Sequence, residues 1–214
     1  MNIGIIGSGD VARSLGQGLV ATGHHVMLGT RNPDKKELAA WKRQTKKHGS
    51  VGSTTEAASH GDIVILAVAW HAAEDVLQQI RPELAGKVVV DVTNPLVFRD
   101  GEAPSLSIGF DMSGGELVQQ SLADSHVVKA LNTVSHAKMV QPEYKEGLPI
   151  AFYCGNNESA KKEVAALLQD LGWKDIVDLG DITKSRLMEQ LTLLWVEYGA
   201  LRGTWDHAFA ILNQ

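Results

Sequence analysis

The sequence is poor in cysteine: Cys154 is the single one in 214 residues. One thiol excludes an internal disulfide and is typical of a reducing compartment. Cys154 ends the apolar run Ile150–Cys154, which predicts a buried strand residue and not a catalytic thiol. The first expected strand begins at Asn2, so we expect no signal or transit peptide and a cytoplasmic location.

Long hydrophobic runs and a strong charge of one sign are also missing. No apolar stretch approaches the roughly 18 residues that a membrane helix needs, so we expect no membrane span. A net charge of −5 gives no reason to expect nucleic-acid binding. Cysteine, histidine and carboxylate residues do not cluster at the spacing of metal ligands, which predicts no metal site. The 44% of hydrophobic residues can fill the core of one large domain.

The N-terminal segment carries a nucleotide-binding motif. An apolar run leads directly into G-x-G-x-x-A, with Gly7, Gly9 and Ala12 at its fixed positions. Gly7 permits a tight turn, Gly9 leaves room for a pyrophosphate, and the small Ala12 lets a helix pack closely on the strand. A helical pattern and a second apolar run, His25–Leu28, complete a βαβ unit whose helix N-terminus favours phosphate. The dinucleotide residues expected at this turn are Gly7, Ser8, Gly9, Asp10, Val11 and Ala12.

The end of the second apolar run distinguishes NAD from NADP. An NAD site typically has a carboxylate there, which holds the ribose 2′-hydroxyl. This chain has Thr30, Arg31 and Asn32 instead, and the first acid is Asp34. Arg31 can bind a 2′-phosphate with two parallel hydrogen bonds, and Lys35 is near enough in sequence to add a second cation. The pattern favours NADP(H).

Strand and helix patterns alternate, which predicts an α/β fold: a Rossmann doubly wound, mainly parallel sheet. Continuous apolar runs such as Asp62–Val68 and Lys87–Val92 are typical of strands buried on both faces. Asn32 predicts the N-cap of a helix over Pro33–Lys47. Residues 97–113 lack periodicity and predict a long functional or mobile loop.

We expect an NADP-binding domain over residues 1–140 and a small extension over residues 141–214, packed into the same globule. The extension comprises an αβ unit and a long helix over about Thr183–Leu201. Apolar residues lie nearly all round this helix, so we expect it to be buried on most sides. The final residues could fold back over it, or a second copy could cover it, and we favour a homodimer through the helix.

Small or polar residues follow several expected strands. In an open α/β sheet, ligands bind beyond the carboxyl ends of the strands. Small residues leave space for the cofactor, and polar groups can position the nicotinamide or a substrate, although each could also form a turn or a cap. The cofactor residues expected at these ends are Ala67, Val68, Ala69, Thr93, Asn94 and Pro95. The expected substrate pocket comprises Trp70, Leu96, Asn132, Thr133, His136 and Leu191.

His71 and His136 are the candidates for proton transfer, because histidine titrates near working pH. The position of each is also compatible with a helix cap. Asp91 lies inside an expected strand, which is more typical of a buried or edge structural acid than of a catalyst.

Five segments together resemble a known family: Gly7–Ala12, Gly29–Arg31, Asp91–Leu96, Val128–Thr133 and Arg186–Leu191. The chain resembles the NADP oxidoreductase, coenzyme F420-dependent family over nearly all of its length. The glycine turn is shared with many dehydrogenases, whereas the N-P-L and K-A-x-N-T strand ends and the closing helix are more specific together. The cytoplasmic domains of six-transmembrane ferrireductases resemble this architecture too.

The resemblance implies hydride transfer between NADP(H) and a deazaflavin or flavin bound face to face, which needs alignment more than acid–base groups. The bulky Trp70 would narrow the acceptor cleft, so a ferric chelate or another small electron acceptor is also open. Two alternatives remain: an NADP(H)-binding redox sensor without turnover, and a small-carbonyl or imine reductase. Too few residues follow the last expected strand for the large helical domain that imine reductases normally append.

Overall fold

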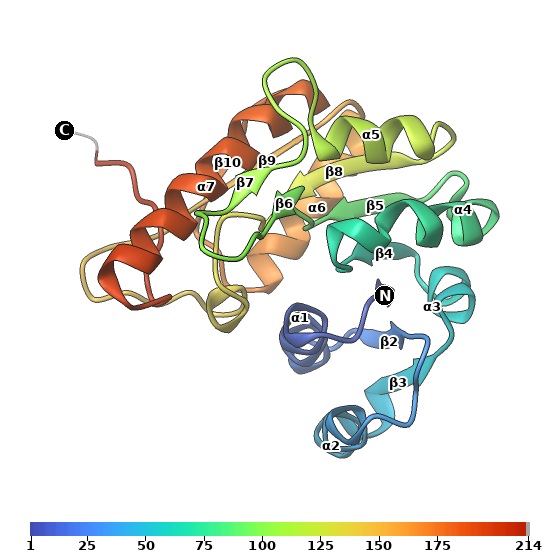
Figure 1. Cartoon of the computed structure of the whole chain (residues 1–214). Helices are drawn as coiled ribbons and strands as arrows, with labels where there is room; N and C mark the ends of the chain where they lie inside the picture. The colour runs from blue at the N-terminus through green and yellow to red at the C-terminus, as the bar shows by residue number, and fades with distance from the viewer. Residues whose placement is uncertain (213–214) are drawn as a thin grey trace.

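The chain folds around one twisted sheet that has helices on both faces (Figure 1). The computed structural model describes residues 1–212, and within them the sheet has eight strands in the order β10-β9-β8-β5-β4-β1-β2-β3. Neighbouring strands are parallel except for β8 and β9. The expected Rossmann-type architecture with a long closing helix is confirmed.

The strands of this sheet are β1 (Asn2–Ile6), β2 (His25–Gly29), β3 (Gly49–Gly52), β4 (Ile63–Leu66), β5 (Val88–Asp91), β8 (His126–Ala130), β9 (Ile150–Gly155) and β10 (Asp175–Asp178). The α-helices are α1 (Asp10–Ala21), α2 (Lys36–Thr45), α3 (Thr54–His60), α4 (Ala73–Leu84), α5 (Gly114–Ser121), α6 (Glu158–Asp170) and α7 (Ser185–Arg202). Short 3₁₀ turns occupy Lys46–His48, Trp70–Ala72, His136–Lys138 and Ile182–Lys184.

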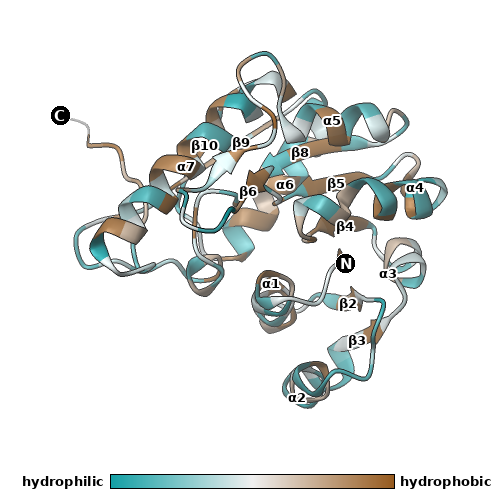
Figure 2. Ribbon diagram, in the orientation of Figure 1, coloured by the Kyte–Doolittle hydropathy of each residue, from teal (hydrophilic) through white to brown (hydrophobic). Residues whose placement is uncertain are grey.

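The interior strands are hydrophobic because helices cover both of their faces. Every residue of β4 and β5 is buried, as expected for parallel strands between two helical layers; Figure 2 shows β5 largely in brown. One apolar cluster joins the sheet to α1, α2 and α6, and a second joins its other face to α3, α4, α5 and α7.

The register of the parallel strands brings their carboxyl ends to one edge of the sheet. Ile6 pairs with Gly29 and with Leu66, Leu66 pairs with Asp91, and Asp91 pairs with Lys129. The segments that follow β1, β2, β4, β5 and β8 therefore emerge side by side, which is where ligands bind in folds of this type.

Helix α2 is shorter than the sequence predicts. Its N-cap is Lys35, and the segment before it is a turn in which the Asp34 N–H donates to Asn32 Oδ1 at 3.2 Å. The expectation that Asn32 caps a helix beginning at Pro33 is wrong, because the asparagine side chain stabilises this local turn instead. At the other end, Lys46 adopts a φ of +52° and the chain continues as a 3₁₀ turn.

The segment 97–113 contains a short strand pairing that the sequence does not predict. β6 (Leu96–Val97) and β7 (Ser105–Leu106) form a short antiparallel ladder that lies beside α7 (Figure 1). The expected loop therefore includes a short β-hairpin. Its strands have two residues each, which is too few to give a recognisable alternation in the sequence. Between the expected units 1–140 and 141–214 the sheet is continuous, since β9 pairs with β8; residues 213 and 214 lie outside the described part.

The last helix is only partly covered. Its inward face holds Met188 and Trp195, and the following tail folds back so that Trp205 lies 5.4 Å from Trp195 between ring centroids. The outward face keeps Leu194 and Leu201 exposed, at 58% and 76% of their surface. Within one chain, the tail therefore covers part of α7 and leaves the outward apolar face free, so the expected burial on most sides would require a second copy.

Cys154 provides a test of this packing. The thiol is fully buried, and burial raises its pKa to about 12. At about pH 8 the native thiol is protonated and sealed, so we expect no reaction with an aromatic disulfide reagent until the protein unfolds. Stopped-flow labelling in increasing denaturant measures this. Rapid stoichiometric labelling of the native protein would contradict the buried position of β9.

Candidate functional site

The turn after β1 requires glycine at its first position. Gly7 has a φ of +136°, and its N–H donates to the Gly29 carbonyl at 2.9 Å. A Cβ atom added at Gly7 would lie 2.2 Å from the Ala67 carbonyl oxygen. Glycine at position 7 thus allows direct backbone contact between the ends of β1, β2 and β4. Any residue with a side chain would prevent this contact.

Gly9 is the N-cap of α1 and faces open space. No side chain caps the first turn of this helix, and a Cβ added at Gly9 would meet no atom within 4 Å. The helix N-terminus therefore opens onto a cavity of about 380 Å³ at the sheet edge. The residues that line this cavity are Gly7, Ser8, Gly9, Gly29, Thr30, Arg31, Asn32, Lys35, Thr54, Ala67, Val68, Ala69, His71, Ala72 and Val76.

The end of β2 supplies the positive charge of this cavity. Thr30 is buried and its hydroxyl lies 3.0 Å from Ser8 Oγ, which fixes the β2 end to the glycine turn. Arg31 and Lys35 are exposed and line the same cavity. In residues 1–212 no carboxylate lies within ion-pair distance of either cation. A glycine-lined helix N-terminus beside two unpaired cations fits the pyrophosphate and the 2′-phosphate of a dinucleotide.

Three other residues of the G-x-G-x-x-A turn point elsewhere. Asp10 pairs with Arg13 on the surface of α1. Ala12 has no exposed surface and lies in the core between helix and sheet, as its small size predicts. Val11 lines a second cavity on the other side of the α1 N-terminus.

This second cavity is the larger of the two, at about 680 Å³, and nine of its ten lining residues come from the C-terminal half of the chain. Its wall combines the segment after β8, the last helix and the tail that folds back over it. The lining residues are Val11, Val134, Ser135, His136, Ala137, Lys138, Trp195, Thr204, Trp205 and Asp206. Because Val11 belongs to the first turn of α1, the two cavities flank the same helix N-terminus.

Reciprocal hydrogen bonds hold the tail against α7. Trp195 Nε1 donates to the His207 carbonyl at 3.1 Å, and His207 Nε2 lies 2.9 Å from the Trp195 carbonyl. The rings of Trp195 and His207 stack at 4.7 Å. Asp206 adds an ion pair to Lys138 at 3.2 Å. The two indoles at positions 195 and 205 therefore form a fixed aromatic wall of the second cavity.

The structure places the residues predicted to form the substrate pocket in several parts of the sheet edge. Of the six, His136 lines the second cavity, where its Nδ1 lies 3.3 Å from Ser14 Oγ. Trp70 packs against Gly114 and lines a separate hollow between α4 and α5 with His71. Leu96 belongs to β6, and Leu191 is half-buried on α7. The two candidate histidines thus belong to different cavities.

The polar groups after β5 and β8 are used inside the protein. Asn94 Nδ2 donates to the Asn132 carbonyl at 2.9 Å, and Asn132 Nδ2 donates to Asn94 Oδ1 at 3.0 Å. Thr192 of α7 donates to Asn94 Oδ1 at 3.1 Å. The Thr93 hydroxyl donates to Asp91 Oδ1 at 2.7 Å. These side chains hold the strand ends together, and Asp91 is the buried structural acid that the sequence predicts.

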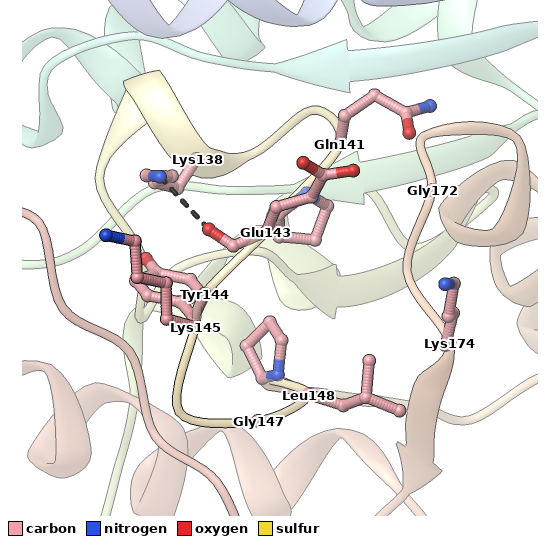
Figure 3. A pocket seen from close by; sticks show the side chains of 11 residues that line it. Lys138, Gln141, Glu143, Tyr144, Lys145, Gly147, Leu148, Gly172 and Lys174 are labelled. Carbon is pink, nitrogen blue, oxygen red and sulfur yellow. Dashed lines mark hydrogen bonds between the residues drawn. The ribbon is translucent and has the colours of Figure 1, made fainter.

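A third cavity of about 530 Å³ lies within the C-terminal extension (Figure 3). It shares Lys138 with the second cavity, and there the lysine Nζ donates to the Glu143 carbonyl at 3.1 Å. Lys145 and Lys174 lie on opposite sides of it. None of its lining residues belongs to the glycine turn or to the strand ends that surround the α1 N-terminus.

Neither a metal cluster nor a membrane helix occurs in the described residues. Across 1–212, no three His, Cys, Asp or Glu side chains are grouped so as to hold a metal ion. The helices of that part are too short or too polar to cross a bilayer.

The aromatic wall of the second cavity is the part that sequence reasoning missed. Trp195 and Trp205 are ten positions apart, one inside the last helix and one just beyond its C-terminal Gly203. A glycine in the left-handed region after a helix is a stop signal that predicts a reversal of the chain. The sequence offers this fold-back as one of two alternatives, and the glycine signal favours it, but the cavity that the two indoles line was not anticipated.

Comparisons with known proteins agree with this geometry. The family model described as NADP oxidoreductase coenzyme F420-dependent matches residues 2–95. The F420-dependent NADP reductase of Methanocaldococcus jannaschii is 33% identical over 205 residues, which cover 92% of this chain and 91% of that protein. Metalloreductase STEAP2 of Homo sapiens is 31% identical over 195 residues, 90% of this chain but 36% of that protein.

Solved structures give the same result. A proposed F420-dependent NADP reductase from Arthrobacter sp. FB24 superposes with a TM-score of 0.94 at 34% identity, and covers 100% of both chains. An imine reductase from Streptomyces aurantiacus matches with a TM-score of 0.66 at 18% identity, over 95% of this chain and 64% of that one, which is a likeness of fold alone. The chain belongs to the NADP oxidoreductase coenzyme F420-dependent family and is an NADP-dependent oxidoreductase.

Proposed function

We propose that the protein transfers a hydride between NADP(H), bound in the cavity beside Arg31, and a flavin-like or deazaflavin acceptor bound in the cavity beside Trp195 and Trp205. The observation that carries this proposal is that the two cavities flank one helix N-terminus, with Gly9 on one side and Val11 on the other. A dinucleotide whose phosphates lie at Gly9 extends along the sheet edge toward the acceptor side.

The second cavity suits a flat aromatic molecule. Its volume of about 680 Å³ is in the range of small-molecule sites, and its walls are mostly apolar with two indoles and a histidine. Aromatic rings stack on such surfaces with a favourable contribution of about 0.5–1.5 kcal/mol beyond area burial. The relatives from methanogens are named for a deazaflavin coenzyme, which supports an acceptor of this shape.

Each side of the site has a physical task. The Gly7–Gly9 turn and the α1 N-terminus bind the pyrophosphate, and Arg31 with Lys35 bind the 2′-phosphate. Bound NADPH supplies the hydride from its nicotinamide ring. The strand-end turns and the aromatic wall align the two rings and exclude water, which accounts for a site without a catalytic triad.

The first test is oxidation of NADPH followed at 340 nm with deazaflavin, FMN, FAD, riboflavin and ferric chelates as acceptors. We expect turnover with an acceptor that has a fused-ring structure. Trp205→Ala should then raise KM for that acceptor roughly fivefold or more, because about 1 kcal/mol of stacking is lost.

Trp205→Phe, which keeps a ring, is the matched control and should stay near the wild-type KM. NADPH binding without turnover of any acceptor would contradict the proposal and favour a redox sensor. If Trp205→Ala leaves KM for the acceptor unchanged, the acceptor does not bind at this cavity.

Arg31 should set the preference for NADPH. Charge-assisted hydrogen bonds to a phosphate contribute about 2 kcal/mol, so Arg31→Asp should lower the NADPH/NADH affinity ratio roughly 30-fold or more. Isothermal titration with both nucleotides measures the ratio. Arg43→Asp makes the same charge change on the exposed side of α2, outside the cavity, and should leave the ratio unaltered. An unchanged NADPH/NADH affinity ratio in Arg31→Asp would contradict the role of Arg31 in binding the 2′-phosphate.

We also propose that the outward face of α7 pairs with a second copy of the chain. Leu187, Leu191, Leu194, Tyr198 and Leu201 follow one another at spacings of four and three residues, the pattern of a coiled-coil seam. Four of them are 47–76% exposed. An apolar stripe of this regularity favours a homodimer over random surface hydrophobicity.

The dimer can be tested at its centre. Leu194→Glu would bury a charge in the seam, so we expect a monomer by light scattering at micromolar concentration, while the wild type is a dimer. Ala200→Glu lies on the same helix but away from the stripe, and should remain dimeric. A wild-type monomer at this concentration would refute the seam.

A further inference from the structure

A lysine without any exposed surface lies at the carboxyl edge of the sheet. Lys129 of β8 places its Nζ 2.9 Å from Asp91 Oδ2 of β5 and 2.9 Å from Glu189 Oε1 of α7. The same Nζ donates to the Thr93 carbonyl at 2.6 Å. All three charged side chains are at most 1% exposed. A charged group in such surroundings must have a partner for every donor.

The charges of this network are balanced. Burial alone would lower the pKa of Lys129, but the carboxylates of Asp91 and Glu189 outweigh it and raise the pKa, so the ammonium stays charged. The second carboxylate is matched by the N-terminus of α5, where the N–H groups of Gly114 and Gly115 each donate to Glu189 at 2.9 Å. Buried ion networks of this kind contribute little net stability relative to apolar side chains. We therefore consider a role for this network other than stability.

The network holds one particular turn. Lys129 binds the Thr93 carbonyl, and Asp91 Oδ1 accepts from the Thr93 N–H at 2.9 Å and from its hydroxyl at 2.7 Å. Every polar atom of Thr93 is thereby fixed. Glu189 connects the same lysine to α7, and one helical turn further Thr192 binds Asn94. The turn after β5 and the last helix are thus held in one register.

This turn lies between the two cavities. In the sheet, β5 stands between β4, whose following residues line the nucleotide cavity, and β8, whose following segment lines the cavity with the indoles. Trp195 follows Thr192 by three residues on the inward face of α7. A shift of the β5 turn relative to α7 would therefore change the distance between whatever the two cavities hold.

We propose that Lys129, Asp91 and Glu189 form a positioning device that fixes the Thr93–Pro95 turn against α7 and so sets the approach of the nicotinamide to the acceptor. The proposal rests on the function proposed above. None of the three residues touches a ligand; they act through the turn and the helix. Alignment of reacting groups is sensitive, since a misplacement of about 1 Å can cost roughly 100-fold in rate.

The first variant removes Lys129 together with one of its two carboxylate partners, so that the remaining Glu189 carboxylate is held by the α5 amides alone. Lys129→Met with Asp91→Asn keeps an oxygen for Thr93 and leaves Glu189 bound to the α5 amides. Adding Glu189→Gln gives an uncharged network in case the double variant does not fold. We expect a thermal midpoint near that of the wild type, NADPH affinity within about threefold because the phosphate contacts are distant, and a kcat lower by about 100-fold.

A second readout needs no acceptor. The fluorescence of NADPH rises when its nicotinamide ring is held in a fixed, water-poor place, so the variants should bind NADPH by calorimetry without the emission gain of the wild type. The matched control is Lys161→Met. Lys161 is also a buried lysine with two carboxylate partners, Glu158 and Asp178, but it lies on α6 at the far edge of the sheet. It should alter neither kcat nor emission.

The outcomes separate the two proposals. A folded variant with wild-type kcat and emission would overturn the positioning role, and so would a parallel loss of NADPH affinity and kcat. Failure of both variants to fold would also overturn it, because the network would then serve stability. If the wild type reduces no acceptor, the proposed function fails, and the emission of bound NADPH still decides whether the network positions the ring.

Discussion

One buried ammonium group ties together three parts of the chain that the sequence keeps far apart. Lys129 lies on β8, Asp91 on β5 and Glu189 on α7, and the lysine Nζ lies 2.9 Å from an oxygen of each carboxylate, at sites that are at most 1% exposed. Burying any one of the three charges without its partners is costly, so packing of β5 and β8 depends on packing of α7. The C-terminal extension is thereby made part of the nucleotide-binding core and not an appendage to it.

The same edge of the sheet also depends on backbone contact. At Gly7 three strand ends come so close that a side chain has no place, and the amide–carbonyl bond to Gly29 closes the contact. Backbone contact orders the turn after β1, and ion pairing orders the turns after β5 and β8. Both kinds of contact fix loops at the ends of parallel strands. Between them they leave two cavities on either side of the α1 N-terminus.

The parts of this arrangement that follow local rules could be predicted from sequence. The Gly7–Gly9 turn and the cations at Arg31 and Lys35 depend on residues close in the chain, and the structure brings them to one cavity. Thr93, Asn94 and Asn132 resemble ligand-binding groups when only strand ends are known. Their partners, Lys129 and Thr192, are distant in sequence, and no periodicity indicates such pairing. The fold-back of the Trp205 tail is a local feature, but the cavity that it lines also needs the segment after β8 and the first turn of α1, which are distant in sequence.

The charged side of one cavity and the aromatic wall of the other come from opposite ends of the polypeptide. One is shaped by residues up to position 76, and the other takes its aromatic wall from positions 195 and 205. No residue lines both cavities. Substitutions in the first cavity can therefore alter nucleotide preference without changing the shape of the second cavity. Nucleotide preference and the fit of the partner molecule thus depend on separate sets of side chains, and the network around Lys129 lies between them.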